Sequence, residues 1–330
     1  MKPLRAFFVL SLLGGVSSAS FGALPPLEKV VQGLYVGTWN DGAGSAETEV
    51  RVVAVGKGNF KLLARREVKG EIVRAEVDGV TDKKSGTVTF NKPFQDQREW
   101  GLVYKDGGVI EGSVGGEAGS FSVKRVERKS PTLGKKPPPG AVVLIDGKNF
   151  DNVKARSGEW IGLDEKDGSI QVPKGGMSGV KKIEGSYDAH VEFNCNLRAT
   201  ARGQGRGNSG FFLANRKEIQ VLDSFGSVTY LGGGCGGLYK FKNPDVMEPV
   251  PSLAGKKDST YNFASLPPGH WQTYDLEWRV KPDGKKALLT AYHNGVKIHD
   301  EVELNHRPGS FSFQDHGNPV RYRNIWYVEK

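Results

Sequence analysis

The stretch DAHVEFNCNL, residues 188–197, alternates between apolar and polar side chains without a break. Its odd-numbered positions, from Ala189 to Leu197, are apolar, and its even-numbered positions are polar or charged. Successive side chains of a β-strand point to opposite faces of the sheet, so this pattern predicts a strand with one buried and one polar face. Such strands are typical of antiparallel sheets.

Residues 141–330 contain further signals of the same kind. Asn294-Gly295 separates two strand-like runs, and this dipeptide favours the type I′ turn of a β-hairpin. The further strands that we expect are Tyr274–Val280, Leu288–His293, Val296–Val302, Phe311–His316 and Ile325–Val328. The stretches Gly226–Gly237 and Asn243–Pro268 predict long loops, which commonly carry function when they are ordered. This half of the chain therefore predicts a two-sheet β-sandwich.

Residues 24–128 also predict short antiparallel strands. A sustained 3.6-residue periodicity is absent, and glycine-containing turns separate β-branched runs. The strands that we expect are Thr48–Val55, Ala75–Val80, Gly86–Phe90, Leu102–Tyr104 and Gly119–Val123, and one short helix is expected at Leu27–Gln32. The prediction is an all-β chain that begins with a small antiparallel β-domain, either a meander or a barrel.

The sequence SPTLGKKPPPG, residues 130–140, separates the two β-rich regions. Three consecutive prolines beside two lysines favour an extended, semi-rigid spacer over a packed element. We therefore divide the chain into a small β-domain at 24–128, a proline-rich linker at 129–140 and a sandwich domain at 141–330.

Residues 1–22 have the layout of a secretory signal peptide. Lys2 and Arg5 precede an apolar stretch from Ala6 to Val16, and small residues follow. This pattern predicts a secreted or periplasmic protein. After this segment no apolar run approaches the ~20 residues of a membrane-spanning helix, so we expect no membrane span.

The net charge of +9 does not point to a nucleic-acid partner. The basic excess is spread over the N-terminal segment, the linker and two nearly balanced domains, whereas nucleic-acid binders concentrate basic residues on one face or helix. Aromatic residues make up 10% of the chain, which is too many for a disordered protein. The sequence does not indicate the oligomeric state.

Several catalytic motifs are absent from the sequence, including Gly-x-Ser-x-Gly, His-Glu-x-x-His and paired Cys-x-x-Cys. The glycine-rich run at residues 203–207 lacks the context of a phosphate loop and predicts a flexible loop. Cys195 and Cys235 are compatible with a disulfide outside the cell and with buried free thiols, and both interpretations stay open. The histidines that we expect on the surface are His270, His293, His299 and His306.

Two polar clusters lie in the predicted sandwich. If Glu218 and Gln220 lie on one strand, they share a face, and Gln314 and His316 have the same relation. Amide and carboxylate groups can bind sugar hydroxyls, and an aromatic ring can stack on the C–H face of a sugar. From the pattern alone, a solvated strand face is the simpler interpretation.

A fixed order of short motifs resembles one known family. The motifs are VLIDG (143–147), Asn208-Ser-Gly210, Glu218-x-Gln220-x-x-Asp223, Cys235-Gly-Gly-Leu-Tyr239, Trp271-Gln-Thr-Tyr-Asp275, His293-Asn-Gly-Val and Gln314-Asp-His-Gly-Asn-Pro-Val-x-x-Arg323-Asn324. Together they resemble the 3-keto-disaccharide hydrolase domain family over residues 141–330. The resemblance implies a concanavalin/laminin-G-like jelly roll whose concave sheet face holds a carbohydrate substrate.

Family members of known activity cleave glycosides that carry a ketone at C3. The ketone acidifies the C2 proton, so a base can remove it and the group at C1 can then leave. By position, the resemblance implies Glu218 or His316 as the base, with the other as acid or metal ligand. It implies Arg321 or Arg323 as the group that stabilises the enolate oxygen.

The residues that the resemblance places against the sugar are Asn208, Gln220, Asp223, Tyr239, Trp271, Gln314 and Arg323. Strand parity puts Asp223 on the opposite side from Glu218 unless a bulge or turn intervenes. A divalent cation near Glu218 or His316 is compatible with this chemistry, but the sequence does not require one. The sequence indicates neither the sugar nor its linkage.

Two other interpretations stay open. One is a non-catalytic laminin-G-like carbohydrate-binding module, and the other is a cell-envelope scaffold that binds its partner through residues 24–128. The enzyme is favoured because Glu218, His316 and Arg321 supply an acid/base set that sugar-binding faces seldom require.

Overall fold

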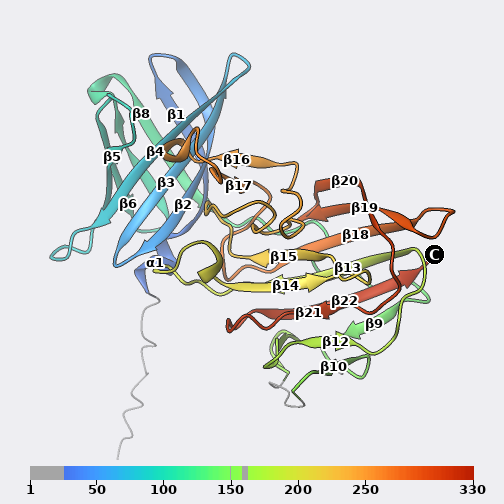
Figure 1. The fold of residues 1–330 in the computed structure, drawn as a ribbon. Helices are drawn as coiled ribbons and strands as arrows, with labels where there is room; N and C mark the ends of the chain where they lie inside the picture. The colour runs from blue at the N-terminus through green and yellow to red at the C-terminus, as the bar shows by residue number, and fades with distance from the viewer. Residues whose placement is uncertain (1–25, 149, 158–162) are drawn as a thin grey trace, which may run out of the picture.

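The computed structural model describes residues 26–148, 150–157 and 163–330 (Figure 1). Strands dominate these residues, and the α-helix among them is α1 (Leu27–Val31), at the position predicted from the sequence. The all-β prediction is therefore confirmed. The predicted signal peptide at 1–22 lies outside the described residues.

The N-terminal region folds as a closed antiparallel barrel. Its strands follow one another in sequence order, and β8 closes the barrel against β1. They are β1 (Gly33–Asp41), β2 (Gly44–Gly56), β3 (Asn59–Val68), β4 (Glu71–Thr81), β5 (Val88–Pro93), β6 (Trp100–Lys105), β7 (Val109–Val114) and β8 (Ser120–Val126). Aromatic side chains pack in the barrel core, where the ring centroids of Trp39 and Trp100 lie 5.3 Å apart.

The C-terminal region is a sandwich of two antiparallel sheets (Figure 1). A five-stranded sheet has the order β10-β12-β21-β14-β15, and a seven-stranded sheet has the order β11-β22-β13-β18-β19-β20, with β9 paired to β22. The bounds are β9 (Val142–Ile145), β10 (Val153–Ala155), β11 (Ile170–Gln171), β12 (Met177–Gly179), β13 (Tyr187–Asn194), β14 (Asn208–Phe212), β15 (Glu218–Leu222), β18 (Gln272–Val280), β19 (Lys286–His293), β20 (Val296–Asn305), β21 (Ser312–Phe313) and β22 (Arg321–Glu329).

The core lies between the two sheets. Ile219 and Phe313 reach it from the five-stranded sheet, and Val191 and Tyr322 reach it from the seven-stranded sheet. The alternation at residues 188–197 thus places the apolar face of β13 inward, as predicted. The strand expected at Phe311–His316 is shorter than predicted, because β21 ends at Phe313.

The long loops of the sandwich attach it to the barrel. The loop that contains β16 (Met247–Pro249) and β17 (Thr260–Asn262) packs against β2 and β3. The guanidinium of Arg51 on β2 donates hydrogen bonds to the carbonyls of Ser265 (2.8 Å) and Phe263 (2.5 Å). The long loop of the sandwich therefore forms the contact with the barrel.

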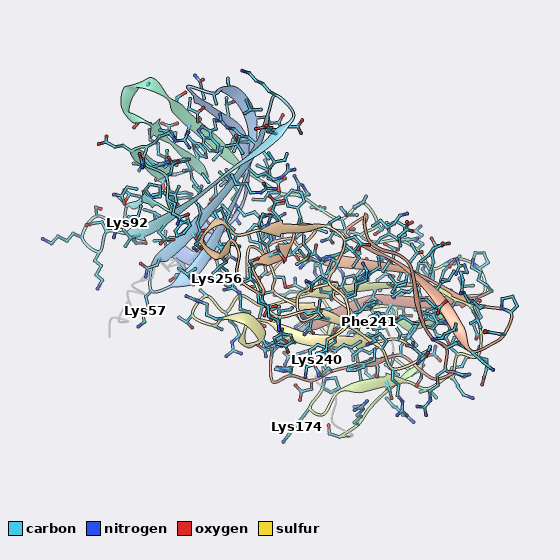
Figure 2. All side chains as sticks on the ribbon, turned by 45° about the horizontal axis from the view of Figure 1, so that its top comes forward. Lys57, Lys92, Lys174, Lys240, Phe241 and Lys256 are labelled. Atoms are coloured by element: carbon cyan, nitrogen blue, oxygen red, sulfur yellow. The ribbon has the colours of Figure 1, made fainter. Side chains whose placement is uncertain are left out.

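The surface lysines are distributed over both halves of the molecule. Lys57 and Lys92 project from the barrel, and Lys174 and Lys240 project from the sandwich (Figure 2). No helix of the described residues is long and apolar enough to cross a membrane.

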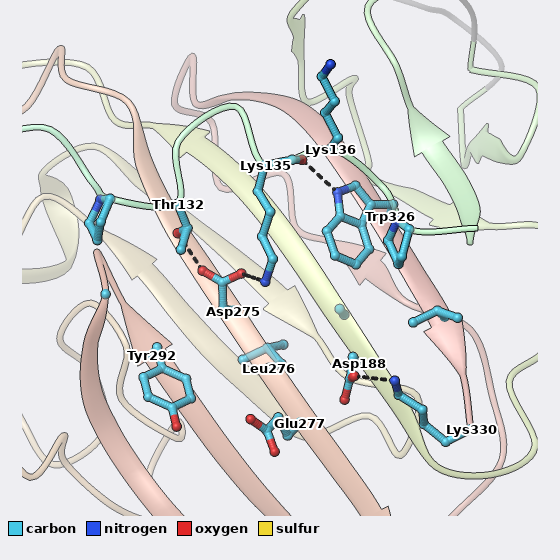
Figure 3. A pocket seen from close by; sticks show the side chains of 15 residues that line it. Thr132, Lys135, Lys136, Asp188, Asp275, Leu276, Glu277, Tyr292, Trp326 and Lys330 are labelled. Carbon is cyan, nitrogen blue, oxygen red and sulfur yellow. Dashed lines mark hydrogen bonds and ion pairs between the residues drawn. The ribbon is translucent and has the colours of Figure 1, made fainter. Parts of the chain in front are cut away.

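The proline-rich stretch is packed, which corrects the expectation of a spacer without packing contacts. Residues 131–134 form turns over the outer face of the seven-stranded sheet (Figure 3). The Thr132 hydroxyl donates to Asp275 (2.6 Å), and Lys135 forms an ion pair with the same carboxylate (2.9 Å). The backbone N–H of Gly134 donates to Glu192 (2.6 Å). Polar side chains on β13 and β18 therefore hold the stretch in place.

His190 lies beneath this stretch and is fully buried. Its Nδ1 is 2.9 Å from Asp275, and its Nε2 is 3.5 Å from Glu192. Burial alone would lower the pKa of His190, but the hydrogen bonds to the two carboxylates outweigh burial and raise it. The predicted polar face of β13 is thus covered by the proline-rich stretch.

Two of the histidines expected on the surface are buried. His293 lies between the amide groups of Asn262 (3.0 Å) and Gln272 (2.9 Å), and burial lowers its pKa to about 3. His299 bonds the carbonyl of Gly236 (2.7 Å), and burial lowers its pKa to about 4. The prediction of exposed histidines is wrong at both positions, because each ring has polar partners inside the fold.

The two cysteines are buried free thiols in this structure. Both belong to the sandwich core, and the Cys235 Sγ lies 3.1 Å from the Tyr274 hydroxyl. Of the two interpretations that the sequence left open, the structure shows the free thiols.

Candidate functional site

The candidate site lies on the outer face of the five-stranded sheet. β14 and β15 pair with Phe212 opposite Glu218 and Gly210 opposite Gln220. Directly opposed residues of antiparallel strands share a face. Ile219 points into the core, so these four residues point away from it.

Glu218 is the titratable group at the centre of this face. Glu218 is 8% exposed, and its carboxylate lies so close to Gly210 that a methyl group on Gly210 would overlap it. Burial raises the pKa of Glu218 from 4.5 to about 7, and the charge of Lys217 opposes this shift. A carboxyl group with such a pKa can both accept and donate a proton near neutral pH.

Two tyrosines adjoin Glu218. The backbone N–H of Tyr239 donates to the carbonyl of Glu218 (3.1 Å), which extends the sheet beyond β15. The hydroxyls of Tyr239 and Tyr230 lie 2.9 Å apart. Burial, the bond to Tyr239 and the nearby charge of Glu218 together raise the pKa of Tyr230 to about 12. The pair supplies neutral hydrogen-bond donors beside the carboxyl group.

Gln204 organises the amides of the same face, and the sequence interpretation missed it. Its Oε1 accepts a hydrogen bond from Gln220 (2.8 Å), and its backbone carbonyl accepts one from Asn208 (2.8 Å). The predicted flexible loop at 203–207 instead holds a short 3-10 turn, Gly203–Gly205, with Gln204 at its centre. The signal in the sequence that could have pointed to Gln204 is its position between two glycines.

Asn208 lies at the end of this row and is nearly fully buried. Its Oδ1 accepts no hydrogen bond from any described residue. Asn208 and Gln220 are thus both bonded to Gln204, and both lie on the sheet face that carries Glu218.

Asp223 differs from its expected role as a sugar ligand. It is buried, and its Oδ2 accepts hydrogen bonds from Arg206 at Nε (2.8 Å) and forms an ion pair at Nη2 (2.7 Å). Burial raises the pKa of Asp223, and the charge of Arg206 opposes this shift. The Asp223 carboxylate is therefore bound by Arg206, and this pair holds the loop that carries Gln204 in place.

Gln314 lies on the other side of Gly210 from Glu218. The backbone N–H of Gln314 donates to the carbonyl of Gly210 (2.8 Å), so Gln314 and Glu218 flank the same glycine. His316 lies two residues further along the chain, beyond the end of β21, and is exposed; its carbonyl accepts a hydrogen bond from Asn318 (2.9 Å).

A polar groove of about 700 Å³ adjoins this face. It runs over β12, β21 and β14, with Phe212, Ser312 and Gln314 among its lining residues. Ser312 pairs with Phe212, which in turn pairs with Glu218. The groove and Glu218 therefore belong to one continuous surface.

A smaller cavity of about 570 Å³ lies on the opposite side, under the proline-rich stretch (Figure 3). Trp326 and Tyr292 line it. Several of its charged groups are paired within the protein, as Lys330 is with Asp188 (2.7 Å).

Arg321, Arg323 and Trp271 are not brought together with Glu218. Tyr322 points into the core, so its two arginine neighbours point out of the seven-stranded sheet, on the far side of the sandwich. Their expected roles at the enolate and the sugar ring are corrected accordingly.

These arginines have structural partners instead. Arg321 donates to the Ser169 hydroxyl (2.7 Å) and forms an ion pair with Asp164 (3.1 Å). Arg323 donates to Glu192 (2.8 Å) and lies over the Trp271 ring, 4.1 Å from its centroid. Both guanidinium groups are thus bound at the outer surface of the seven-stranded sheet.

Across the described part of the chain, no three His, Cys, Asp or Glu side chains gather in a group that could hold a metal ion. Near Glu218 the neighbours are amides, hydroxyls and Lys217, a set that suits a sugar better than a divalent cation.

Comparison with known proteins connects this geometry to one family. The model of the 3-keto-alpha-glucoside-1,2-lyase-like domain matches residues 140–327. A candidate glycosyl hydrolase from Parabacteroides distasonis is 30% identical with a TM-score of 0.47, and the match covers 58% of this chain and 85% of that one. A xylan beta-1,4-xylosidase from Bacillus halodurans is 9% identical with a TM-score of 0.32, covering 86% of this chain and 65% of that one. No curated protein matches the chain.

Proposed function

This chain belongs to the 3-keto-alpha-glucoside-1,2-lyase-like family of carbohydrate-active proteins, and from that membership we propose that it cleaves 3-keto-glycosides with Glu218 as the proton-transferring group. The observation that carries the proposal is the Glu218 carboxyl group, whose pKa is raised to about 7 on a face lined with amides and hydroxyls.

The reaction begins at C2 of the oxidised sugar. Glu218 takes the C2 proton, and the electrons of the C–H bond form the enolate of the C3 ketone. The enolate then expels the oxygen substituent at C1, which leaves with a proton from an acid. Addition of water across the new double bond completes net hydrolysis, whereas release before hydration gives the unsaturated keto-sugar.

Neighbouring groups match the other needs of this reaction. The hydroxyls of Tyr230 and Tyr239 can donate hydrogen bonds to oxygens that gain charge in the transition state. The amides of Gln220 and Gln314 can bind sugar hydroxyls. His316 stays the proposed acid for the leaving group, since its side chain is exposed and it follows Gln314 by two residues.

The test uses a 3-keto-glucoside with a chromogenic aglycone and the full chain. We expect aglycone release by the wild type and a loss of about 10²–10⁴-fold in Glu218→Gln. Arg321→Gln is the matched control on the opposite sheet. The proposal fails if the wild type releases no aglycone, or if Glu218→Gln is as active as the control.

A non-catalytic carbohydrate-binding module is the second candidate. The polar groove beside Glu218 favours it, because serines and Gln314 line a surface open to solvent. Binding of an unoxidised glycan together with no turnover of the 3-keto form would select this alternative.

We also propose that the protein acts outside the cytoplasm, on the basis of the pattern at residues 1–22. N-terminal sequencing of the chain recovered from its source checks this. Cleavage after Ala19 or Gly22 is expected, and an intact N-terminus in the cytoplasm would contradict it.

A further inference from the structure

We propose that the groove beside Glu218 binds an anionic group of the substrate, so that the preferred ligand is a glycan bearing carboxylate or sulfate groups. The proposal deepens the function above and rests on it for its catalytic consequence. The binding itself is argued from the residues of the groove.

Three arginines line the groove from three separate segments. Arg156 follows β10, Arg216 lies in the turn between β14 and β15, and Arg307 lies in the loop between β20 and β21. All three are exposed, and no described residue forms a hydrogen bond or ion pair with any of these guanidinium groups.

The other arginines of the described residues are all engaged. Each of their guanidinium groups donates a hydrogen bond or forms an ion pair within the protein. These arginines are Arg51, Arg65, Arg66, Arg74, Arg98, Arg125, Arg128, Arg198, Arg202, Arg206, Arg279, Arg321 and Arg323. Among the described residues, the arginines whose guanidinium groups have no partner in the protein thus all line one groove. Unpaired arginines scattered over a solvated surface would not share one site.

The charge balance of the groove is positive. Lys182 adds a fourth cation at its wall, although it pairs with Glu184 (2.9 Å). Asp315 is the carboxylate among the lining residues, and it accepts hydrogen bonds from the backbone N–H groups of Gly175 (3.0 Å) and Gly317 (2.8 Å). It forms no ion pair with the arginines, so their charge is left for a ligand.

The remaining lining groups suit a sugar rather than a bare ion. Ser178, Ser310 and Ser312 offer hydroxyls, and Gln314 offers an amide. The half-buried Phe212 ring provides an apolar surface for the C–H face of a sugar. Guanidinium groups match carboxylate and sulfate oxygens in a bidentate arrangement. Together these groups describe a site for a charged sugar.

The position of the groove relates it to the reaction centre. β21 and β15 flank β14, and neighbouring strands lie ~4.8 Å apart, so Ser312 is about two strand spacings, ~10 Å, from Glu218. The charged group would therefore lie on a part of the substrate away from the C2 proton. We infer that it acts in substrate selection and not in the proton transfer.

Calorimetric titration with unoxidised oligosaccharides tests the binding. The probes are an oligogalacturonate, a sulfated galacto-oligosaccharide and the neutral galacto-oligosaccharide of equal length. We expect at least one anionic probe to bind about tenfold or more tightly than the neutral one at low salt, and to lose this advantage at high salt. The probe that binds identifies the anionic group, and equal binding of all three overturns the proposal.

Charge-matched variants locate the effect. Arg216→Gln combined with Arg307→Gln should remove most of the preference, about tenfold. Lys57→Gln combined with Lys92→Gln removes two exposed cations from the barrel and should leave the preference unchanged (Figure 2). Equal effects of the two double variants would contradict the proposal.

Two outcomes, measured with neutral and anionic sugars, separate this proposal from the proposed function. Turnover of a neutral 3-keto-glucoside without any anionic preference would reject the groove assignment and keep the catalytic one. Binding of an anionic glycan without turnover of any 3-keto-glycoside would keep the groove assignment and reject catalysis.

Discussion

The carboxylate of Glu218 lies against the bare backbone of Gly210 on the neighbouring strand. Because Gly210 has no side chain, the carboxylate can approach the backbone of this strand closely. The close approach also removes water from one side of the carboxyl group, which agrees with its raised pKa. The glycine in the Asn-Ser-Gly motif thus has a physical role in the site.

Gly210→Ala should displace Glu218, since the added methyl group would overlap the carboxylate. We expect turnover of a 3-keto-glucoside to fall by about 10²-fold, because a shift of ~1 Å at a reacting group has this cost. Gly205→Ala is the control, because its methyl group would lie 3.7 Å from the nearest side-chain atom, that of Ala201. Equal activity of the two variants would show that the close approach has no catalytic importance.

Glu218 should make the protein less stable as pH rises. Its pKa is raised from 4.5 to about 7 in the folded state, so between these values the folded protein holds a proton that the unfolded chain has released. The free energy of unfolding therefore falls over this window, by about 3 kcal/mol at most. Urea denaturation of Glu218→Gln from pH 4 to pH 8 should lack this component. Parallel curves for both proteins would contradict a raised pKa.

Arg321→Gln should leave the reaction intact and weaken the fold slightly. Its guanidinium is bonded to Ser169 and Asp164 on the far sheet and is partly exposed. We expect unchanged kcat and KM for a 3-keto-glucoside, with a loss of about 1 kcal/mol in urea denaturation. A large fall in kcat without loss of stability would return Arg321 to the site.

Asp275→Asn should loosen the proline-rich stretch from the sheet. The substitution removes the charge that bonds His190, Thr132 and Lys135, and we expect a loss of about 1–3 kcal/mol in urea denaturation. Asp300→Asn, which removes an exposed pair with Lys297, should cost less than about 1 kcal/mol. Faster proteolysis within residues 129–140 of Asp275→Asn alone would support the contact, and equal stability of both variants would contradict it.

The pH dependence of this contact has a definite sign. The pKa of His190 is raised, so its contribution to stability is present at low pH and is lost as pH rises through the folded value. Burial alone would raise the pKa of Glu192, but hydrogen bonds from His190, Asn324 and Arg323 lower it to about 2. Its contribution is present above about pH 4.5 and is lost as pH falls toward 2.

Local patterns were enough to predict many of the strands and the face that Glu218 and Gln220 share. A period of two defines a strand face whatever the partner strand is, and β13, β15 and the β19–β20 hairpin follow it. Glycine-containing turns and β-branched runs likewise predicted β2, β4, β5, β6 and β8 of the barrel, but not β1, β3 and β7. The ordered motifs indicated the family, and the family model confirms that resemblance.

Long-range pairing could not be read from the same patterns. Arg321 and Gln314 are neighbours in one motif, yet the chain passes from one sheet to the other between β21 and β22. The buried positions of His190 and His293 depend on segments distant in sequence, namely residues 130–136 and Asn262. Gln204 carries no motif, and only the folded chain brings it to Gln220. Arg156, Arg216 and Arg307 likewise carry no motif, and only the folded chain gathers them around one groove.

Exchange of the C2 proton of a 3-keto-glucoside with deuterated solvent, followed by NMR, tests the central claim most directly. The account predicts rapid exchange or aglycone release with the wild type and with Arg321→Gln, and a loss of about 10²–10⁴-fold with Glu218→Gln. Exchange at the wild-type rate in folded Glu218→Gln would contradict it.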